Sequence, residues 1–381
     1  MDPEERICLL LAKGRLSPVD RDEALAIASQ GPRWELILDL SIQQEVYPLI
    51  CRNLRDLGFP GVPVEAQEKF TALFRMNVLR NDLLARELVQ LLTTLHQASI
   101  PVIPLKGLYL AESLYGETSL RVCSDMDILV PRNSVPQAFD LLLSRGYQAD
   151  FPRWVATDRM MQRCVQIPLW QAEGAMQHLV EIHWGLFLEA SHEEAGIQDL
   201  WAEARRKDFQ GAPAWILSPE WQFLFLLVHA ARHNWQGLKW LADIHEICVQ
   251  GGIQWAKVLA KSRMMGWDPM VQWSLGVCHA ILGTPLPSSI PLQLPHPRRK
   301  LLLALRSRGN RWKNLLVLLR AERRLSRKFG LLARRLFVPT TAEYALCRLP
   351  GSLAFLYYPL RPLRIGCTMG RSLVRLVFSV R

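Results

Sequence analysis

The chain has 381 residues, half of them apolar, and carries a formal net charge of +11. This length and composition exclude general disorder and allow a buried core in two or three domains. The eight scattered cysteines form no C-x-x-C pair, which excludes a zinc or disulfide framework and indicates a reducing cytoplasm. The acidic N-terminus is unlike a secretory signal, and no apolar run is long enough to span a bilayer. We therefore expect a soluble cytoplasmic protein, at most peripheral at the inner face of the membrane.

Residues 1–98 are expected to form an N-terminal helical region. Apolar residues recur at helical spacing in a segment that begins at Arg21, in one from Trp34 to Leu54, and in a long one from Val64 to Gln97. These segments contain no chemical motif, so we interpret them as packing elements.

Strands and helices alternate between residues 99 and 212, and only there. A short apolar run that ends at Gly107 predicts a buried strand followed by a tight turn. The next segments predict helix, strand, helix, strand and strand, at Leu108 to about Tyr115, Asp127 to Val130, Val135 to about Arg145, Cys164 to Trp170 and His178 to Trp184. Such alternation is typical of an α/β layer.

The remaining chain divides into a helical and a basic region. Residues 213–297 have a helical pattern, with Pro219 where the first turn of a helix tolerates it. Residues 298–381 contain twenty Lys and Arg but only two acids, a local charge of +18. This basic amphipathic region could meet nucleic-acid phosphates or anionic lipid headgroups, or it could be a solvated or packed helical surface.

Two aspartates form the first chemical feature. Asp125 and Asp127 stand around Met126, where a strand would project both toward one face. Neighbouring carboxylates repel each other unless a cation lies between them, and Mg²⁺ takes carboxylates together with substrate phosphates. Glu181, in an alternating run, provides a third acid. Three carboxylates on adjacent strands could hold two metal ions.

Basic residues stand nearby in the sequence. Lys106 and Gly107 end a strand and begin a helix, so backbone amides could hold a triphosphate while Lys106 adds a point charge. Arg121 could neutralise phosphate as well. Each feature alone could equally well have a structural role. It is the order of these features along the chain that favours a nucleotide site.

The segments “LKGLYLAESLYGETSLRVCSDMDILV”, “AFDLLLSRGY” and “VEIHWGLF” together resemble the uncharacterised bacterial nucleotidyltransferase family of the DNA polymerase beta-like superfamily. The resemblance spans about residues 100–190, and “HAARHNWQGLKWLADIHEI” is similar to the helical segment that follows in such proteins. It implies an α+β fold, in which a small mixed-sheet nucleotidyltransferase core is flanked by N-terminal and C-terminal helical regions.

The resemblance also implies roles for particular residues. Asp125, Asp127 and Glu181 would be the catalytic metal ligands, and Lys106 and Gly107 would form the phosphate turn. The usual G-G or G-S turn is replaced here by Lys106-Gly107, so we expect Lys106 to act in place of the missing serine.

The segment after residue 213 adds further polar residues. His229 and His233 stand four apart on one helical face with Arg232 beside them, and Lys239 and Asp243 form a similar pair. Lys239, with His233, could meet the phosphates or base of a nucleotide as a helical domain closes over the site. The alternative is a polar seam between helices. A two-histidine zinc site is disfavoured, because H-E-x-x-H is absent.

The sequence thus predicts a magnesium-dependent nucleotidyltransferase that moves a nucleoside monophosphate from an NTP, expected to be ATP, to a hydroxyl acceptor such as a small molecule or saccharide. One ion held by all three carboxylates would activate the acceptor, and a second, shared by Asp125 and Asp127, would bind the triphosphate. Glu181 or Asp127 could serve as general base. Two alternatives stay open: a toxin-like enzyme acting on RNA through the basic C-terminus, and a non-catalytic scaffold at the membrane surface.

Overall fold

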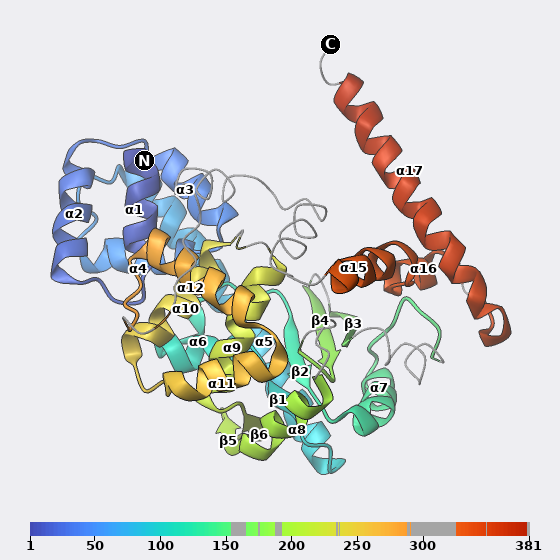
Figure 1. Ribbon diagram of the computed structural model, residues 1–381. Coiled ribbons are helices and arrows are strands. Elements are labelled where there is room, and N and C mark those ends of the chain that lie inside the picture. Colours follow the sequence, from blue (N-terminus) through green and yellow to red (C-terminus); the bar gives the residue numbers. More distant parts are fainter. Residues whose placement is uncertain are drawn as a thin grey trace.

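The computed structural model describes residues 1–153, 165–173, 176–186, 193–233, 235, 237–287, 290, 325–347 and 349–378. These residues form an α+β fold with a four-stranded mixed sheet flanked by helices on both sides (Figure 1). The predicted fold class is confirmed.

The N-terminal region is helical, as expected, and contains α1 Pro3–Leu11, α2 Pro18–Ser29, α3 Trp34–Gln43, α4 Tyr47–Asp56 and α5 Val64–Gln97. The bounds predicted for α5 are confirmed. The segment from Trp34 to Leu54 is a correction, because it forms two helices rather than one. Glu45 turns the chain with a φ of 55°, and Pro48 occupies the first turn of α4, where its missing N–H has no partner to lose.

The central sheet has the strand order β1-β2-β4-β3. Its strands are β1 Ile103–Pro104, β2 Met126–Leu129, β3 Gln166–Glu173 and β4 Met176–His183. β1 is antiparallel to β2, β2 is parallel to β4, and β3 and β4 form an antiparallel pair. All four strands lie within a few residues of their predicted positions, while Cys164, expected to begin one of them, lies outside the described residues. The parallel pair of β2 and β4 is the feature that builds the site.

Two helices accompany the sheet, and a small hairpin extends it. α6 Leu108–Tyr115 follows β1, and α7 Val135–Ser144 follows β2, both close to their predicted bounds. The hairpin, β5 Arg205–Phe209 and β6 Ala212–Ile216, comes after α8 Glu193–Glu203. It lies beside β1, because the Trp215 amide donates to the Val102 carbonyl at 2.8 Å.

The second helical region contains α9 Pro219–Arg232, α10 Leu238–Gln250, α11 Trp255–Met265 and α12 Asp268–Leu282. Pro219 stands in the first turn of α9, as predicted, and the Ser218 side chain caps that helix by accepting from the Trp221 amide. Helices α9 to α12 share one hydrophobic core with α1 to α4, through buried residues such as Leu11, Ile50, Trp221, Leu227 and Leu241. Two regions that are far apart in the sequence therefore pack as one helical layer.

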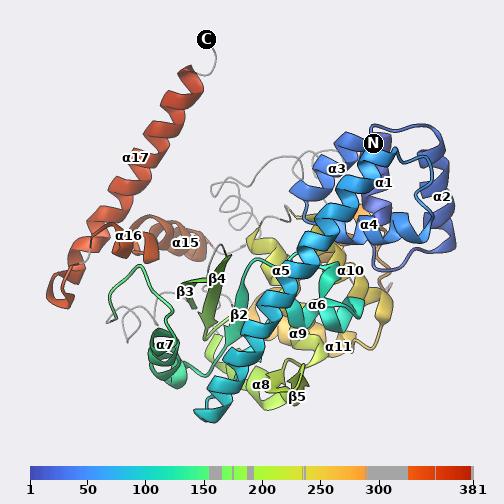
Figure 2. The same ribbon diagram turned by 180° about the vertical axis from the view of Figure 1, so that it is seen from behind.

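A second core lies around the sheet. It joins the later turns of α5 to β2 and β4 through residues such as Leu92, Ile128 and Ile182. Figure 2 shows α5 running from the N-terminal helices across to the sheet. α5 therefore connects the helical layer to the sheet.

The C-terminal helices are α15 Leu325–Phe337, α16 Thr341–Leu346 and α17 Tyr357–Phe378. They lie on the side of the sheet away from the N-terminal helices, and α17 projects from the body of the protein (Figures 1 and 2). Among the residues that the structure describes, we find no helix that is both long and apolar enough to span a bilayer.

Candidate active site

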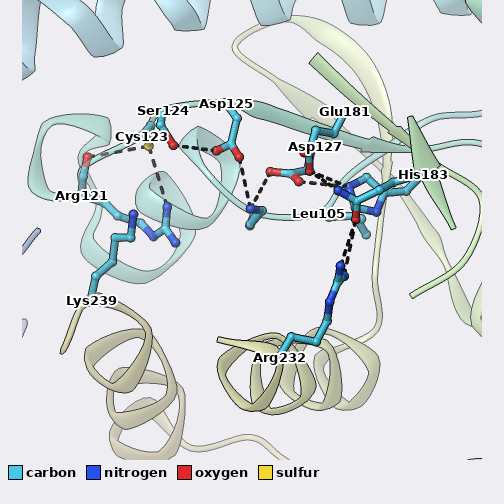
Figure 3. Close-up of polar contacts among 12 residues, drawn as sticks. Leu105, Arg121, Cys123, Ser124, Asp125, Asp127, Glu181, His183, Arg232 and Lys239 are labelled. Atoms are coloured by element: carbon cyan, nitrogen blue, oxygen red, sulfur yellow. Dashed lines mark hydrogen bonds and ion pairs between the residues drawn. The ribbon is translucent and has the colours of Figure 1, made fainter. Parts of the chain in front are cut away.

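Three polar side chains converge where β2 and β4 run side by side. The parallel register pairs Asp127 with Glu181 and Leu129 with His183. Residues two apart in a strand point to the same face, so Glu181 and His183 both lie on the side of Asp127. The His183 Nε2 atom is 3.0 Å from Asp127 Oδ1 and 3.6 Å from Glu181 Oε2 (Figure 3).

Lys106 reaches the same place from the end of β1. Its Nζ atom lies 3.0 Å from Asp127 Oδ2 and 3.5 Å from Asp125 Oδ2. The turn that allows this approach depends on Gly107, because its φ of 71° is a backbone conformation that residues with a side chain rarely adopt. The predicted proximity of the Lys106-Gly107 turn to the aspartates is therefore found in the structure.

The charges in this cluster hold one another in the ionised form. Burial alone would raise the pKa of Asp127, but the Lys106 charge and the His183 hydrogen bond outweigh it and lower that pKa below its usual value. Burial alone would lower the pKa of Lys106 and of His183, but the neighbouring carboxylates raise both. Asp127 is therefore an ionised carboxylate that is only 2 % exposed.

These residues fit a divalent metal ion. Asp127, Glu181 and His183 each offer one ligand atom, and these atoms lie within 4.8 Å of one another. Asp127 Oδ2 is buried and accepts no hydrogen bond. Its negative charge is balanced by the ammonium group of Lys106. Two carboxylates and one imidazole form a donor set that suits several divalent cations.

The grouping differs in one member from the set expected from the sequence. Asp127 and Glu181 belong to it, but its third member is His183, which we did not select. Asp125 stands one residue before β2, where its carboxylate contacts Lys106 and accepts from the Ser124 hydroxyl at 3.1 Å. The period-two alternation that placed Glu181 also places His183 on the same face and could have identified it.

Arg232 of α9 is linked to the site through Gln166 of β3. Gln166 donates to Glu181 Oε2 at 2.6 Å, and its own Oε1 accepts from the two terminal nitrogens of Arg232 at 3.4 and 3.5 Å. Figure 3 shows the Arg232 side chain reaching from α9 toward Glu181 and His183. Sequence reasoning noted Arg232 only as a neighbour of two histidines.

Arg121, expected to neutralise phosphate, is engaged elsewhere. Its guanidinium is 5 % exposed and forms an ion pair with Asp243 of α10, with Nη2 3.0 Å from Oδ2. Burial would lower the pKa of Arg121, but Asp243 raises it. The Tyr115 hydroxyl donates to the same carboxylate at 3.0 Å. Arg121 thus joins the loop before the aspartates to α10.

Lys239, also expected to contact the nucleotide, connects α10 to the same loop and to the N-terminal helical region. Its Nζ atom lies 2.5 Å from a Glu45 carboxylate oxygen and donates to the Val122 carbonyl at 3.4 Å. Only 9 % of the Lys239 side chain is exposed, and burial lowers its pKa. Both cations are therefore paired with carboxylates in this structure.

The loop before the aspartates is also fixed from the side of α5. The Asn77 amide donates to the carbonyls of Ser119 and Arg121 at 2.7 and 3.3 Å. The Asn81 amide donates to the carbonyls of Thr118 and Arg121 at 2.6 and 2.8 Å. Two buried amides on successive turns of one helix thus set the path of the chain into β2.

Comparison with protein families gives a match. The family described as “Uncharacterised nucleotidyltransferase” matches residues 30–283, which is well over half of the chain and includes the sheet, the site and helices α9 to α12. No curated protein and no solved structure matches the chain.

Proposed function

Because the chain belongs to the uncharacterised nucleotidyltransferase family, we propose that it transfers a nucleoside monophosphate from a nucleoside triphosphate to a hydroxyl acceptor and releases pyrophosphate. The observation that carries this proposal is the convergence of Asp127, Glu181 and His183 on adjacent strands, with Lys106 beside them. Phosphoryl-group transfer depends mainly on positioning and on charge stabilisation, which such a cluster can provide.

Asp127, Glu181 and His183 would hold a divalent cation, and Asp125, which shares Lys106 with Asp127, would be a carboxylate for a second ion. We propose Mg²⁺, because carboxylate oxygens predominate in this set, and Mn²⁺ is the closest substitute. A cation bound there would supply Lewis acidity, which lowers the pKa of the acceptor hydroxyl and offsets charge on the triphosphate.

The basic residues would bind the triphosphate. Lys106 already carries its charge at the aspartate pair, and the Gly107 turn opens α6, so both can face a phosphate that bridges to the metal site. Arg232 provides a second cation from α9, where its guanidinium donates to the side-chain oxygen of Gln166 beside Glu181. In this proposal Arg121 and Lys239 position the loop and α10 rather than touch the phosphates.

Glu181 is the better candidate for the general base. Its side chain is 21 % exposed, whereas that of Asp127 is fully buried and paired with Lys106. As the acceptor oxygen bonds to the α-phosphorus, the bond from that phosphorus to the β-phosphate oxygen breaks and pyrophosphate leaves. The proton of the acceptor hydroxyl passes to the Glu181 carboxylate.

The acceptor that we propose is a small molecule or saccharide, and ATP is the nucleotide that we would test first. An RNA acceptor is the alternative, since the basic region after residue 298 could follow a phosphate backbone.

The test is transfer of label from each α-labelled NTP into a cell lysate, with Mg²⁺ or Mn²⁺, by the wild type and by Asp127→Asn. Asp140→Asn is the matched control, because Asp140 lies on α7 in an exposed ion pair with Arg153. We expect label with the wild type and Asp140→Asn but not with Asp127→Asn, while ribonuclease and protease treatment identifies the acceptor class. Equal labelling by all three proteins, or none together with no nucleotide binding, would contradict the proposal.

A further inference from the structure

Three aromatic side chains form a stack where α9 ends and α10 begins. His229 and His233 stand on successive turns, with ring centroids 4.7 Å apart. The Trp240 ring lies 5.5 Å from His229, edge to face, and 4.4 Å from His233 at a tilt of 33°. His229 is buried, Trp240 is half-buried and His233 is exposed, so the stack reaches the protein surface at the His233 ring.

The stack lies next to the carboxylate site. Arg232, the residue before His233, contacts Gln166, which in turn donates to Glu181. A nucleotide whose phosphates meet Arg232 would therefore have its base beside this stack.

The rings are neutral near pH 7. Although His233 as a residue is exposed, packing of its ring against His229 and Trp240 desolvates the imidazole, and together with the cations Arg232, Lys106 and Lys239 this lowers the pKa of His233 to about 4. Burial is also the main cause that lowers the pKa of His229 well below its usual value. Neutral aromatic rings stack on any nucleobase, because every base has a π-face.

The orientation of the indole is fixed in advance. Gly237 lies so close to Trp240 that a Cβ there would be 2.7 Å from the indole Cε3 atom. The absence of a side chain at Gly237 therefore lets the indole rest against the backbone while its neighbour His233 remains at the surface. A ring pair held in this way loses little freedom when a ligand stacks on it.

We propose that the His233–Trp240 pair is the platform for the nucleobase of the triphosphate substrate. This inference rests on the proposed function and adds the part of the substrate that the carboxylate site does not contact. Stacking tolerates every base, so the platform accepts all four nucleotides and holds the larger purines more tightly.

The test compares two ligands that differ in having a base. Binding of the Mg²⁺ complexes of α,β-methylene ATP and of inorganic tripolyphosphate is measured by calorimetry. His233→Ala is expected to weaken binding of the ATP analogue by about tenfold and to leave tripolyphosphate binding unchanged. His233→Phe, which keeps a flat ring, should restore the affinity for the analogue. Arg232→Gln is the matched control on the neighbouring residue and should weaken both ligands.

The outcomes separate the two proposals. If the wild type binds both ligands and His233→Ala weakens both equally or neither, the platform is wrong while the proposed function stands. If the wild type binds neither ligand, the proposed function itself fails, and the platform fails with it.

A different observation concerns helices α15 to α17. Of the large apolar side chains that are exposed among the described residues, seven lie between residues 325 and 378, namely Phe329, Phe337, Leu346, Leu353, Phe355, Leu356 and Leu363. The same range contains nine Lys and Arg and one acid, Glu343. Glu343 is buried and paired with Arg361 and Arg364, so its charge does not reach the surface.

These helices are anchored at one end. Tyr357, at the start of α17, is fully buried in the core around the sheet, and its hydroxyl accepts from the Leu349 amide at 2.7 Å. The rest of α17 projects away from the body (Figure 1). A set of exposed apolar side chains in a sequence segment rich in Lys and Arg suits the boundary between headgroups and acyl chains.

We infer that α15 to α17 dock on an anionic lipid surface, with the apolar side chains inserted and the basic ones at the lipid phosphates. Deletion of α17 would remove the buried Tyr357, so the test uses the full chain with substitutions at exposed positions. Phe355→Glu combined with Leu363→Glu should abolish co-sedimentation with vesicles of phosphatidylcholine and phosphatidylglycerol. Val19→Glu, at an exposed apolar position of α2, should not abolish it.

Three results would overturn this second inference. The first is wild-type protein that does not sediment with anionic vesicles or sediments equally with pure phosphatidylcholine. The second is loss of self-association, rather than of vesicle binding, in the double variant, because the surface would then cover a second copy. The third is loss of RNA binding without any change in vesicle binding.

Discussion

Arg121 and Asp243 form a buried ion pair that joins two parts of the chain, with side chains 5 % and 0 % exposed. Arg121 stands in the loop that leads to the aspartates, and Asp243 stands in α10. The Tyr115 hydroxyl donates to the same carboxylate, so the pair has a further polar partner. The geometry of the loop before β2 therefore depends on a helix that comes much later in the chain.

Breaking this pair should destabilise the protein strongly. In Asp243→Asn the Arg121 charge stays buried without its anion, and we expect the free energy of unfolding in urea to fall by about 3 kcal/mol. The double variant Arg121→Met/Asp243→Leu should lose less, because no uncompensated charge remains. The control is Glu35→Gln, in the exposed pair with Lys69, which should change stability by at most about 0.5 kcal/mol. Similar losses for Asp243→Asn and Glu35→Gln would refute this account.

His183 should be required for metal binding. We expect His183→Ala to weaken Mn²⁺ binding, measured by electron paramagnetic resonance, by about tenfold or more, because one ligand in three is lost. His178→Gln is the matched control, since His178 lies on the same strand but on the opposite face. If His183→Ala binds Mn²⁺ as the wild type does, the three-residue grouping is not the metal site.

The sequence could predict the strand residues of the site but not all of their partners. The D-x-D spacing and the alternation around Glu181 follow from the period of a strand, so Asp127 and Glu181 were found. His183 was missed because only carboxylates were sought as ligands for Mg²⁺, although His183 obeys the same alternation. The parallel register that sets Asp127 beside Glu181 is tertiary, since these residues are separated by all of α7 and β3.

The partners of the basic residues Arg121 and Lys239 could not be predicted from the sequence. A positive charge near two aspartates in the sequence can face a phosphate or a carboxylate of the protein, and only the fold decides which. Asp243, which pairs with Arg121, is 122 residues away in the chain, and Glu45, which pairs with Lys239, stands in the N-terminal helical layer. No local pattern indicates either pairing.

The helices and strands were predicted where their apolar pattern is strong. α5 and α6 follow the helical period from end to end, and their bounds were found. The hairpin of β5 and β6 was missed, because four of the five residues of β5 are exposed and only Phe209 is buried. A strand without buried alternation carries no signal of this kind.

Asn81 should contribute to both stability and activity. Asn81→Ala removes the donor for the Thr118 carbonyl and one of three donors for the Arg121 carbonyl, both in the loop before β2. We expect a loss of about 2 kcal/mol in the free energy of unfolding and slower nucleotidyl transfer, because the chain entering β2 is less well fixed. Asp82→Ala, at the next and exposed position of α5, should change stability by less than about 0.5 kcal/mol. Equal stability of the two variants would show that the Asn81 contacts are not significant.

Acid should destabilise the protein in part through His245. This side chain is 5 % exposed, and its Nδ1 atom is 3.0 Å from the Thr284 hydroxyl. Burial, with a smaller effect of the Lys13 charge, lowers the pKa of His245 from 6.5 to about 4. Between these two pH values the unfolded chain binds a proton that the folded chain does not. The stabilising contribution of neutral His245 is therefore complete above pH 6.5 and is lost as the pH falls from 6.5 toward 4.

His245→Gln keeps a polar partner for Thr284 but cannot titrate. We expect urea unfolding of the wild type between pH 7 and pH 4 to show a fall in stability of which about 2 kcal/mol disappears in His245→Gln. The fall that remains would include the contribution of buried His229, whose pKa is also lowered. His96→Gln, at an exposed position of α5, should leave the wild-type pH profile unchanged. If His245→Gln and His96→Gln give the same profile, His245 does not remain neutral through this pH range, and the acid sensitivity arises elsewhere.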